Sequence, residues 1–301
     1  MADLFRRLLE DRLASIGLVI LTLLAVVAVA APWLATHPDQ IYDMSPMERL
    51  QAPSASHWFG TDSMGADIYS RLLFGTRITF MTAVVAISAA LVIGVPLGLL
   101  MGMGEGLISR AADRISEVFL SIPQIVLAIA IAQTLGPSLR NVILALSLTY
   151  WPWFARLVAG ETRSLRKELF VKASISLGAS PARVLFLHIL PNLASPLIVR
   201  TTLGMGYAIL TAAALGFLGL GAQSPSPEWG RTIAESREYL PDAWWYALAP
   251  GAAIFLVVMG FNLLGDGLRD ILDPRTRRSA QVAPRKSSRW PFFNRPVSAP
   301  K

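Results

Sequence analysis

The sequence predicts an all-α membrane protein with six transmembrane helices. Of its 301 residues, 53% are hydrophobic and only 16% are charged, and the mean hydropathy is +0.51. Such a composition is too apolar for a soluble domain of this size. The chain also contains six apolar segments, each of roughly the 20 residues that cross a bilayer, separated by loops rich in charge, Pro and Gly.

The first apolar segment follows a short basic lead-in over residues 1–15 and is expected to form a span within residues 16–36. Ala28, Val29 and Ala30 imitate a signal-peptide cleavage site, and cleavage there would leave five spans. That alternative stays open from the sequence. The six predicted segments are Ile16–Leu34, Thr79–Met103, Ile115–Leu135, Leu139–Val158, Pro196–Leu220 and Ala247–Leu264.

Basic residues predict the orientation. With the amino end inside, the cytoplasmic segments hold twenty Lys and Arg residues and the outer loops hold six; Arg200, at the edge of a predicted span, is in neither group. An excess of this kind marks the cytoplasmic side, so both ends are expected there. The basic, Pro- and Ser-rich tail at 276–301 is expected to be disordered.

Several functions are unlikely on composition alone. Cysteine is absent, which excludes disulfides and thiolate chemistry. The three histidines, His37, His57 and His188, are far apart in the sequence, so no metal site is expected. No P-loop and no catalytic constellation is visible. The net charge of +7 sits in membrane-flanking loops rather than on one face, so no nucleic-acid partner is expected. Substrate-binding residues cannot be assigned.

Two polar loops carry most of the local signals. In the inner one, at 161–192, a short helix is predicted at Phe170–Leu177, ended by Gly178, with a second helix opened by Pro181 and ended by Pro191. In the outer one, at 37–78, a short helix on the membrane surface is predicted within Trp58–Arg77. The spacing of Asp67 and Arg71 suggests an ion pair across one helical turn.

The inner loop resembles the "EAA" coupling loop of ABC-importer permeases. Ala173, Gly178, Leu190 and Pro191 fall in register with that motif, whereas Lys172 stands where Glu is usual. Ser174 replaces the second Ala, and His188 replaces a common Ile. The resemblance implies an ATPase-coupling role for Phe170, Lys172, Ala173, Ser174, Leu177, Gly178, His188, Leu190 and Pro191.

The outer loop resembles the signature of the peptide and nickel branch of the same family, with Ala66 departing from it where Arg is usual. The signature residues carried over are Gly60, Thr61, Asp62, Gly65, Asp67, Arg71 and Arg77. Two further stretches match the family, the Pro-x-Pro-x-Trp-Gly pattern at 225–230 and the carboxyl end at 260–275.

The resemblance implies a type I ABC importer permease with a transmembrane core at 79–275, in the bacterial cytoplasmic membrane. It further implies a heterodimer with a sister permease, two cytoplasmic ATPases that hold ATP and Mg²⁺, and a periplasmic or lipid-anchored solute-binding protein. No cofactor is expected in this chain. A di- or oligopeptide substrate is favoured over nickel or another small solute. An ion-driven secondary transporter is the alternative of another class, although the spans carry few charges and show no inverted repeat.

Overall fold

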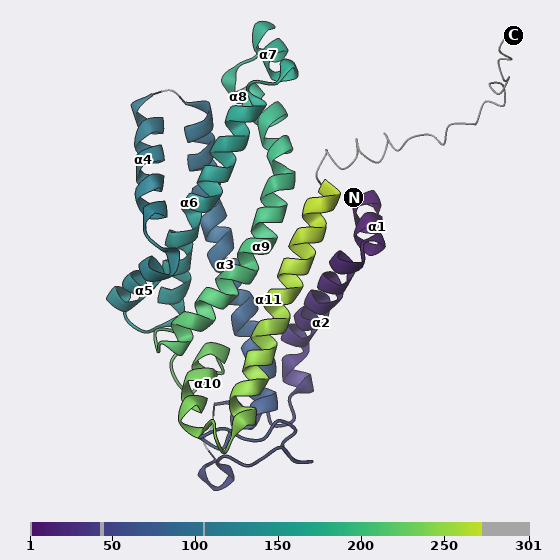
Figure 1. Ribbon diagram of the computed structural model, residues 1–301, viewed down its shortest axis with the longest axis vertical. Helices are drawn as coiled ribbons and strands as arrows, with labels where there is room; N and C mark the ends of the chain where they lie inside the picture. The colour runs from purple at the N-terminus through teal and green to yellow at the C-terminus, as the bar shows by residue number, and fades with distance from the viewer. Residues whose placement is uncertain (1, 43–44, 105, 273–301) are drawn as a thin grey trace, which may run out of the picture.

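The computed structural model describes residues 2–42, 45–104 and 106–272, with side chains from residue 6 onward (Figure 1). These residues form helices and no strand; a single isolated bridge pairs Thr61 with Asp67. Five helices are long and apolar enough to cross a membrane. They are α2 (Arg12–Leu34), α3 (Ile68–Met103), α6 (Leu139–Leu165), α9 (Leu190–Phe217) and α11 (Trp244–Leu272). The predicted tail at 276–301 lies outside the described residues.

The remaining predicted span is broken. Helix α4 (Leu107–Ser121) and helix α5 (Gln124–Leu135) meet at an angle of 93°, so the segment predicted from Ile115 to Leu135 is sharply bent. Pro123 lies at the break, immediately before α5, where its fixed φ and missing N–H prevent a continuous helix. With 12 residues, α5 is about 18 Å long, less than the roughly 30 Å of the hydrocarbon core.

Helix α3 begins earlier than the sequence predicted. The prediction of a separate short helix within Trp58–Arg77 is wrong, because Ile68 is the first residue of a continuous 36-residue helix. The Asp67 side chain caps this helix by accepting a hydrogen bond from the Ser70 N–H at 2.8 Å. The polar outer loop therefore connects directly to a spanning helix.

Helices α3 and α6 pack closely through glycines at every fourth position of α3. A Cβ added at Gly94 would lie 2.6 Å from the Trp151 carbonyl oxygen, and one at Gly98 would lie 2.5 Å from that of Ala155. At Gly102 the nearest atom would be the Thr162 Cβ, at 2.5 Å. Small residues allow helix backbones to approach in a bilayer, where apolar burial itself gives little driving force.

The bundle has two distinct ends, visible in Figure 1. Helix α7 (Leu169–Ser176) and helix α8 (Pro181–Val184) form one, called here the α7 end. Helix α10 (Trp229–Ser236), residues 36–42 and residues 45–67 lie at the other, called here the α10 end. Helix α1 (Ala2–Glu10) and the last turns of α11 point toward the α7 end. Both described chain ends are thus on the same side of the bundle as α7.

Candidate functional site

Helix α7 is short because the chain turns sharply after it. Gly178 has φ of +83°, a left-handed conformation that side chains disfavour. Its N–H donates to the Ile175 carbonyl at 2.9 Å, and the Ala179 N–H donates to the Ser174 carbonyl at 3.1 Å. These bonds satisfy the last carbonyls of the helix. A Cβ added at Gly178 would meet nothing within 4 Å, so this turn faces open space.

A small apolar cluster holds α7 against the ends of the spans. Val171 is fully buried and packs in one cluster with Val184, Ile189 and Leu193. His188 adds a polar link, since its Nε2 lies 3.1 Å from the Ser174 Oγ. The rings of His188 and Phe170 meet edge to face with centroids 6.0 Å apart. The orientation of α7 is therefore fixed by residues of the segment from Val184 to Leu193, which leads into α9.

The exposed surface of the loop that carries α7 is apolar. Leu169 is 82% exposed and Leu177 is 88% exposed, while Phe186 and Leu187 are also exposed. Lys172 and Ala173 are exposed on α7 between the two leucines. Exposed apolar side chains gathered on one projecting element mark an interaction surface. The residues that the sequence predicted to couple to the ATPases thus form two groups: some are exposed, and the others hold α7 in place.

Pro191 does not end a helix, contrary to the sequence-based prediction. It lies in the first turn of α9, and the helical path continues from Pro181 to Phe217. Residues 185–189 form a π-helical turn, in which the Leu190 N–H donates to the Leu185 carbonyl five residues back. A wider turn of this kind accommodates a residue without an N–H. Leu190 and Pro191 therefore connect the coupling loop to α9 rather than separating them.

At the α10 end, the ion pair expected between Asp67 and Arg71 is replaced by another. The Arg71 Nη1 lies 3.2 Å from the Asp62 Oδ2, and both side chains are almost completely buried. Asp62 also accepts hydrogen bonds from the N–H groups of Met64 and Ala66. Burial raises the pKa of Asp62, and the positive charge of Arg71 acts in the opposite direction. Asp67 precedes the helix instead of lying on its face, which explains the error.

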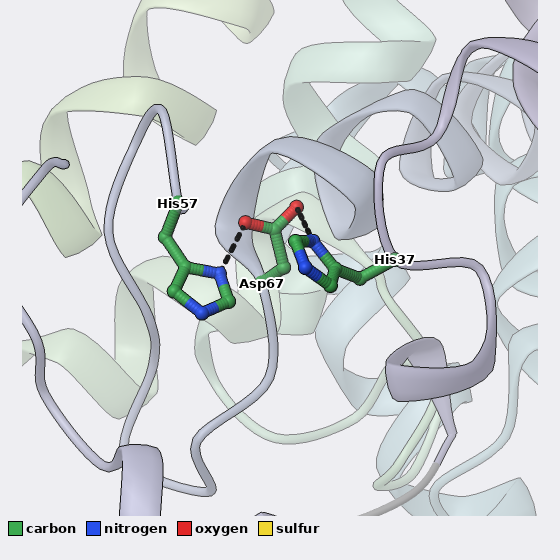
Figure 2. A group of neighbouring side chains, drawn as sticks. All are labelled: His37, His57 and Asp67. Atoms are coloured by element: carbon green, nitrogen blue, oxygen red, sulfur yellow. Dashed lines mark hydrogen bonds and ion pairs between the residues drawn. The ribbon is translucent and has the colours of Figure 1, made fainter. Parts of the chain in front are cut away.

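Asp67 instead accepts hydrogen bonds from several segments. Figure 2 shows its carboxylate between His57 and His37. The His57 Nδ1 lies 3.0 Å from Oδ1 of Asp67, and the His37 Nδ1 lies 3.9 Å from Oδ2, beyond hydrogen-bond distance. Oδ2 accepts from the Ser70 N–H and hydroxyl and from the Thr36 hydroxyl. This carboxylate therefore ties the end of α2, the loop around His57 and the start of α3 together.

The histidines are close in space although they are distant in the sequence. Ligand atoms of His37, His57 and Asp67 lie within 4.8 Å of one another, so sequence separation was a wrong reason to set them aside. The Asp67 carboxylate, however, already accepts four hydrogen bonds, about its full capacity. These hydrogen bonds give the cluster a structural role, as the junction that holds the three segments together.

The other signature residues shape the loop around this junction. Gly60 and Gly65 both have positive φ, and a Cβ at Gly65 would lie 1.9 Å from the Ser45 carbonyl oxygen. The buried Thr61 hydroxyl accepts from the Gln51 N–H at 2.8 Å and donates to the Glu48 carbonyl. Arg77 lies apart from them, exposed on α3.

Glu228, which the sequence did not single out, is a third buried acid at the α10 end. Its carboxylate occupies the space where a Cβ of Gly216 would lie, 2.1 Å from Oε1. Burial raises its pKa to about 7, against the opposing effect of the Gly230 and Ala222 N–H groups. The sequence signal was its place between two matched family residues, Pro227 and Trp229.

Comparisons with known proteins agree with this architecture. A family model described as "Binding-protein-dependent transport system inner membrane component" matches residues 94–278. A second, "N-terminal TM domain of oligopeptide transport permease C", matches residues 1–53. Among solved structures, the MetNI methionine ABC transporter in inward-facing conformations has a similar chain, with a TM-score of 0.56 and 21% identity. The match covers 68% of this chain and 98% of the other, and it supports a type I permease fold.

Full-length relatives are more similar in sequence. The dipeptide transport system permease protein DppC of Alkalihalophilus pseudofirmus is 46% identical over 91% of this chain and 90% of its own. The probable D,D-dipeptide transport system permease protein DdpC of Escherichia coli K12 is 46% identical over 85% and 86%. The glutathione transport system permease protein GsiD of Pectobacterium atrosepticum is 41% identical over 91% of each chain. This multi-pass helical chain therefore belongs to the family of binding-protein-dependent transport system inner membrane components.

Proposed function

We propose that this chain is a permease subunit of an ATP-driven importer of di- or oligopeptides in the bacterial cytoplasmic membrane. The observation that carries the coupling role is α7, which presents exposed Leu169 and Leu177 at one end of the spanning helices. The peptide substrate rests on the high identity to permeases named for dipeptides and glutathione. Substrate selection among peptides belongs to the solute-binding protein.

The α7 end faces the cytoplasm in this proposal. The distribution of Lys and Arg supports it, because most of those in the described part of the chain belong to segments at that end. The described chain ends, α1 and the end of α11, also point toward it. The α10 end then faces the solute-binding protein.

The partners follow from this arrangement. A sister permease completes the translocation path as a heterodimer, and two ABC ATPases bind ATP and Mg²⁺ on the cytoplasmic side. The exposed apolar side chains of α7 enter a groove on one ATPase. When ATP closes the ATPase pair, α7 moves with its ATPase and the spans tilt, which closes the inner mouth and opens the outer one. In this proposal the catalytic groups and the nucleotide belong to the ATPases.

Lys172 gives the loop a particular partner requirement. It is exposed on α7 at the position where the related loops carry Glu, so the charge presented to the ATPase is reversed. We therefore expect the ATPase to place an acidic group opposite Lys172. Changing Lys172 to Glu would then place like charges in contact and weaken coupling.

The decisive experiment is reconstitution of the complete transporter in liposomes with its sister permease, ATPases and binding protein. Uptake of radiolabelled dialanine that requires ATP and the binding protein is the expected result. A sodium or proton gradient applied without ATP should drive no uptake. Gradient-driven uptake by the chain without ATPases would instead establish a secondary transporter.

A further inference from the structure

One charged side chain in the middle of the bundle has no acidic partner among the residues that the structure describes. Arg200 is ten residues into α9, about 15 Å along it. Its Cζ lies 4.7 Å from the ring centroid of Trp153, which is near the middle of α6. Arg200 therefore lies near the middle of the bundle's length, not at the edge of a span where the sequence had placed it.

Other arginines near this position are paired. The Arg156 Nη2 lies 3.7 Å from a Glu117 carboxylate oxygen, and the Arg163 Nη2 lies 2.7 Å from one of Asp113, both on α4. No ion pair in the described part of the chain includes Arg200. A charge inside a membrane span is costly unless a polar partner or water compensates it. The guanidinium therefore requires an acceptor from outside this chain.

The groups around Arg200 are polar. The Tyr150 and Tyr207 hydroxyls are its electrostatic neighbours. The Tyr150 hydroxyl is 3.2 Å from the Thr211 Oγ1 and within hydrogen-bonding reach of the Gln124 amide. The Gln124 Nε2 is itself buried. A second polar donor, on a different helix, thus lies in this cluster.

This cluster lies on a face of the bundle that the chain leaves uncovered. Trp153 is 43% exposed and Tyr207 is 58% exposed. Arg200 and Tyr207 are seven residues apart, so they share one face of α9. Hydrocarbon tails cannot accept hydrogen bonds from a guanidinium or an amide. The face must border water, a solute or another subunit.

We infer that Arg200, held over the Trp153 ring, binds the carboxylate of the solute as it passes through the membrane. A guanidinium binds a carboxylate through two parallel hydrogen bonds, and the Gln124 amide and the tyrosine hydroxyls supply further polar contacts. The inference rests on the proposed function, because every peptide with a free carboxyl terminus carries this group. It also identifies the carboxyl terminus as the end of the peptide that faces α9 midway through transport.

The first test measures transport by the complete reconstituted complex. Arg200→Gln should lower dialanine uptake by about tenfold or more, the loss expected for a charge-assisted pair. The loaded binding protein should still stimulate ATP hydrolysis, and the ATPases should still co-purify. Arg200→Lys, which keeps the charge but not the paired geometry, should recover part of the uptake. Arg7→Gln, which removes an exposed Arg on α1, should leave uptake unchanged.

The second test uses the absence of cysteine from the natural chain. Tyr207→Cys should react with the anionic thiol reagent 2-sulfonatoethyl methanethiosulfonate. In Tyr207→Cys/Arg200→Gln the rate should fall about twofold or more, because the attracting charge is gone. The neutral reagent methyl methanethiosulfonate should react equally with both variants. Val92→Cys, an exposed apolar position on α3, should not react with the anionic reagent.

The two tests separate the possible failures. If the wild-type complex imports no dialanine, the proposed function fails, while the thiol rates still decide whether Arg200 attracts anions. Equal uptake by the wild type and Arg200→Gln overturns the inference although the function stands. Loss of the sister permease or the ATPases from Arg200→Gln, with no reaction at Tyr207→Cys, assigns Arg200 to a subunit contact and also overturns it.

Discussion

Arg71 and Asp62 form an ion pair at 3.2 Å in which each side chain is at most 4% exposed. The pair joins the first turn of α3 to the loop before it, and Arg71 also reaches toward the Ser226 carbonyl near α10. Removing either partner strongly destabilises the folded protein, because the other charge is then buried and unpaired.

Breaking this pair should therefore destabilise the protein strongly. Asp62→Ala and Arg71→Ala should each cost about 3–5 kcal/mol, and the double variant should cost much less than their sum. The measurement is thermal unfolding of the purified complex in detergent for all four members of the cycle. Strictly additive losses would show that the two side chains do not stabilise each other.

Glu228 should make stability depend on pH. Its pKa is raised from 4.5 to about 7, so its contribution is fully present below about pH 4.5 and is lost as the pH rises through 7. The difference corresponds to about 3 kcal/mol. Melting temperatures measured from pH 5 to pH 8 should fall for the wild type and change less for Glu228→Gln. Glu238→Gln, at an exposed site near α10, should follow the wild type.

Gly178→Asp should detach or uncouple the ATPases while the protein still inserts in the membrane. The left-handed φ costs a side chain about 1 kcal/mol, and a carboxylate adds bulk and desolvation at the interface. Gly136→Asp is a matched control, because Gly136 has φ of +88°, equally open surroundings and a place away from the α7 end. ATPase co-purification and dialanine uptake distinguish them. Normal coupling in Gly178→Asp would refute the role of the loop.

Close packing of α3 on α6 should make Gly98 intolerant of any side chain. Gly98→Ala places a Cβ 2.5 Å from the Ala155 carbonyl oxygen and should cost about 1–3 kcal/mol or more. Gly160→Ala, on α6 with nothing within 4 Å of its added Cβ, should be neutral or stabilising. Melting temperatures of the two variants provide the check, and equal values would mean that the helices can separate at no cost.

The spanning helices were predictable because hydropathy depends only on which residues are near one another in the chain. Ile16–Leu34 and Leu139–Val158 correspond closely to α2 and α6. The short helix ended by Gly178 was also predictable, since Gly is the residue that a left-handed turn requires. Local chemistry was sufficient in each case.

Contacts between distant segments were not predictable in this way. The spacing of Asp67 and Arg71 matches an ion pair across one helical turn. Spacing alone, however, does not show whether Asp67 lies within the helix or just before its first residue. His57 meets Asp67 only because the loop folds back over α3. Similarly, Arg200 appeared to lie at a span edge because hydropathy did not show that the helix continues back to Pro181.

One continuous helical path from Pro181 to Phe217 joins the loop that carries α7 to the middle of the bundle. His188, which contacts α7, and Arg200, which stacks on Trp153, are on the same rod twelve residues apart. Pro196 lies between them, at a place where a helix can bend. If the ATPases move α7 as proposed, the same movement would shift Arg200 and release the solute, to an extent set by the stiffness of α9 at this proline.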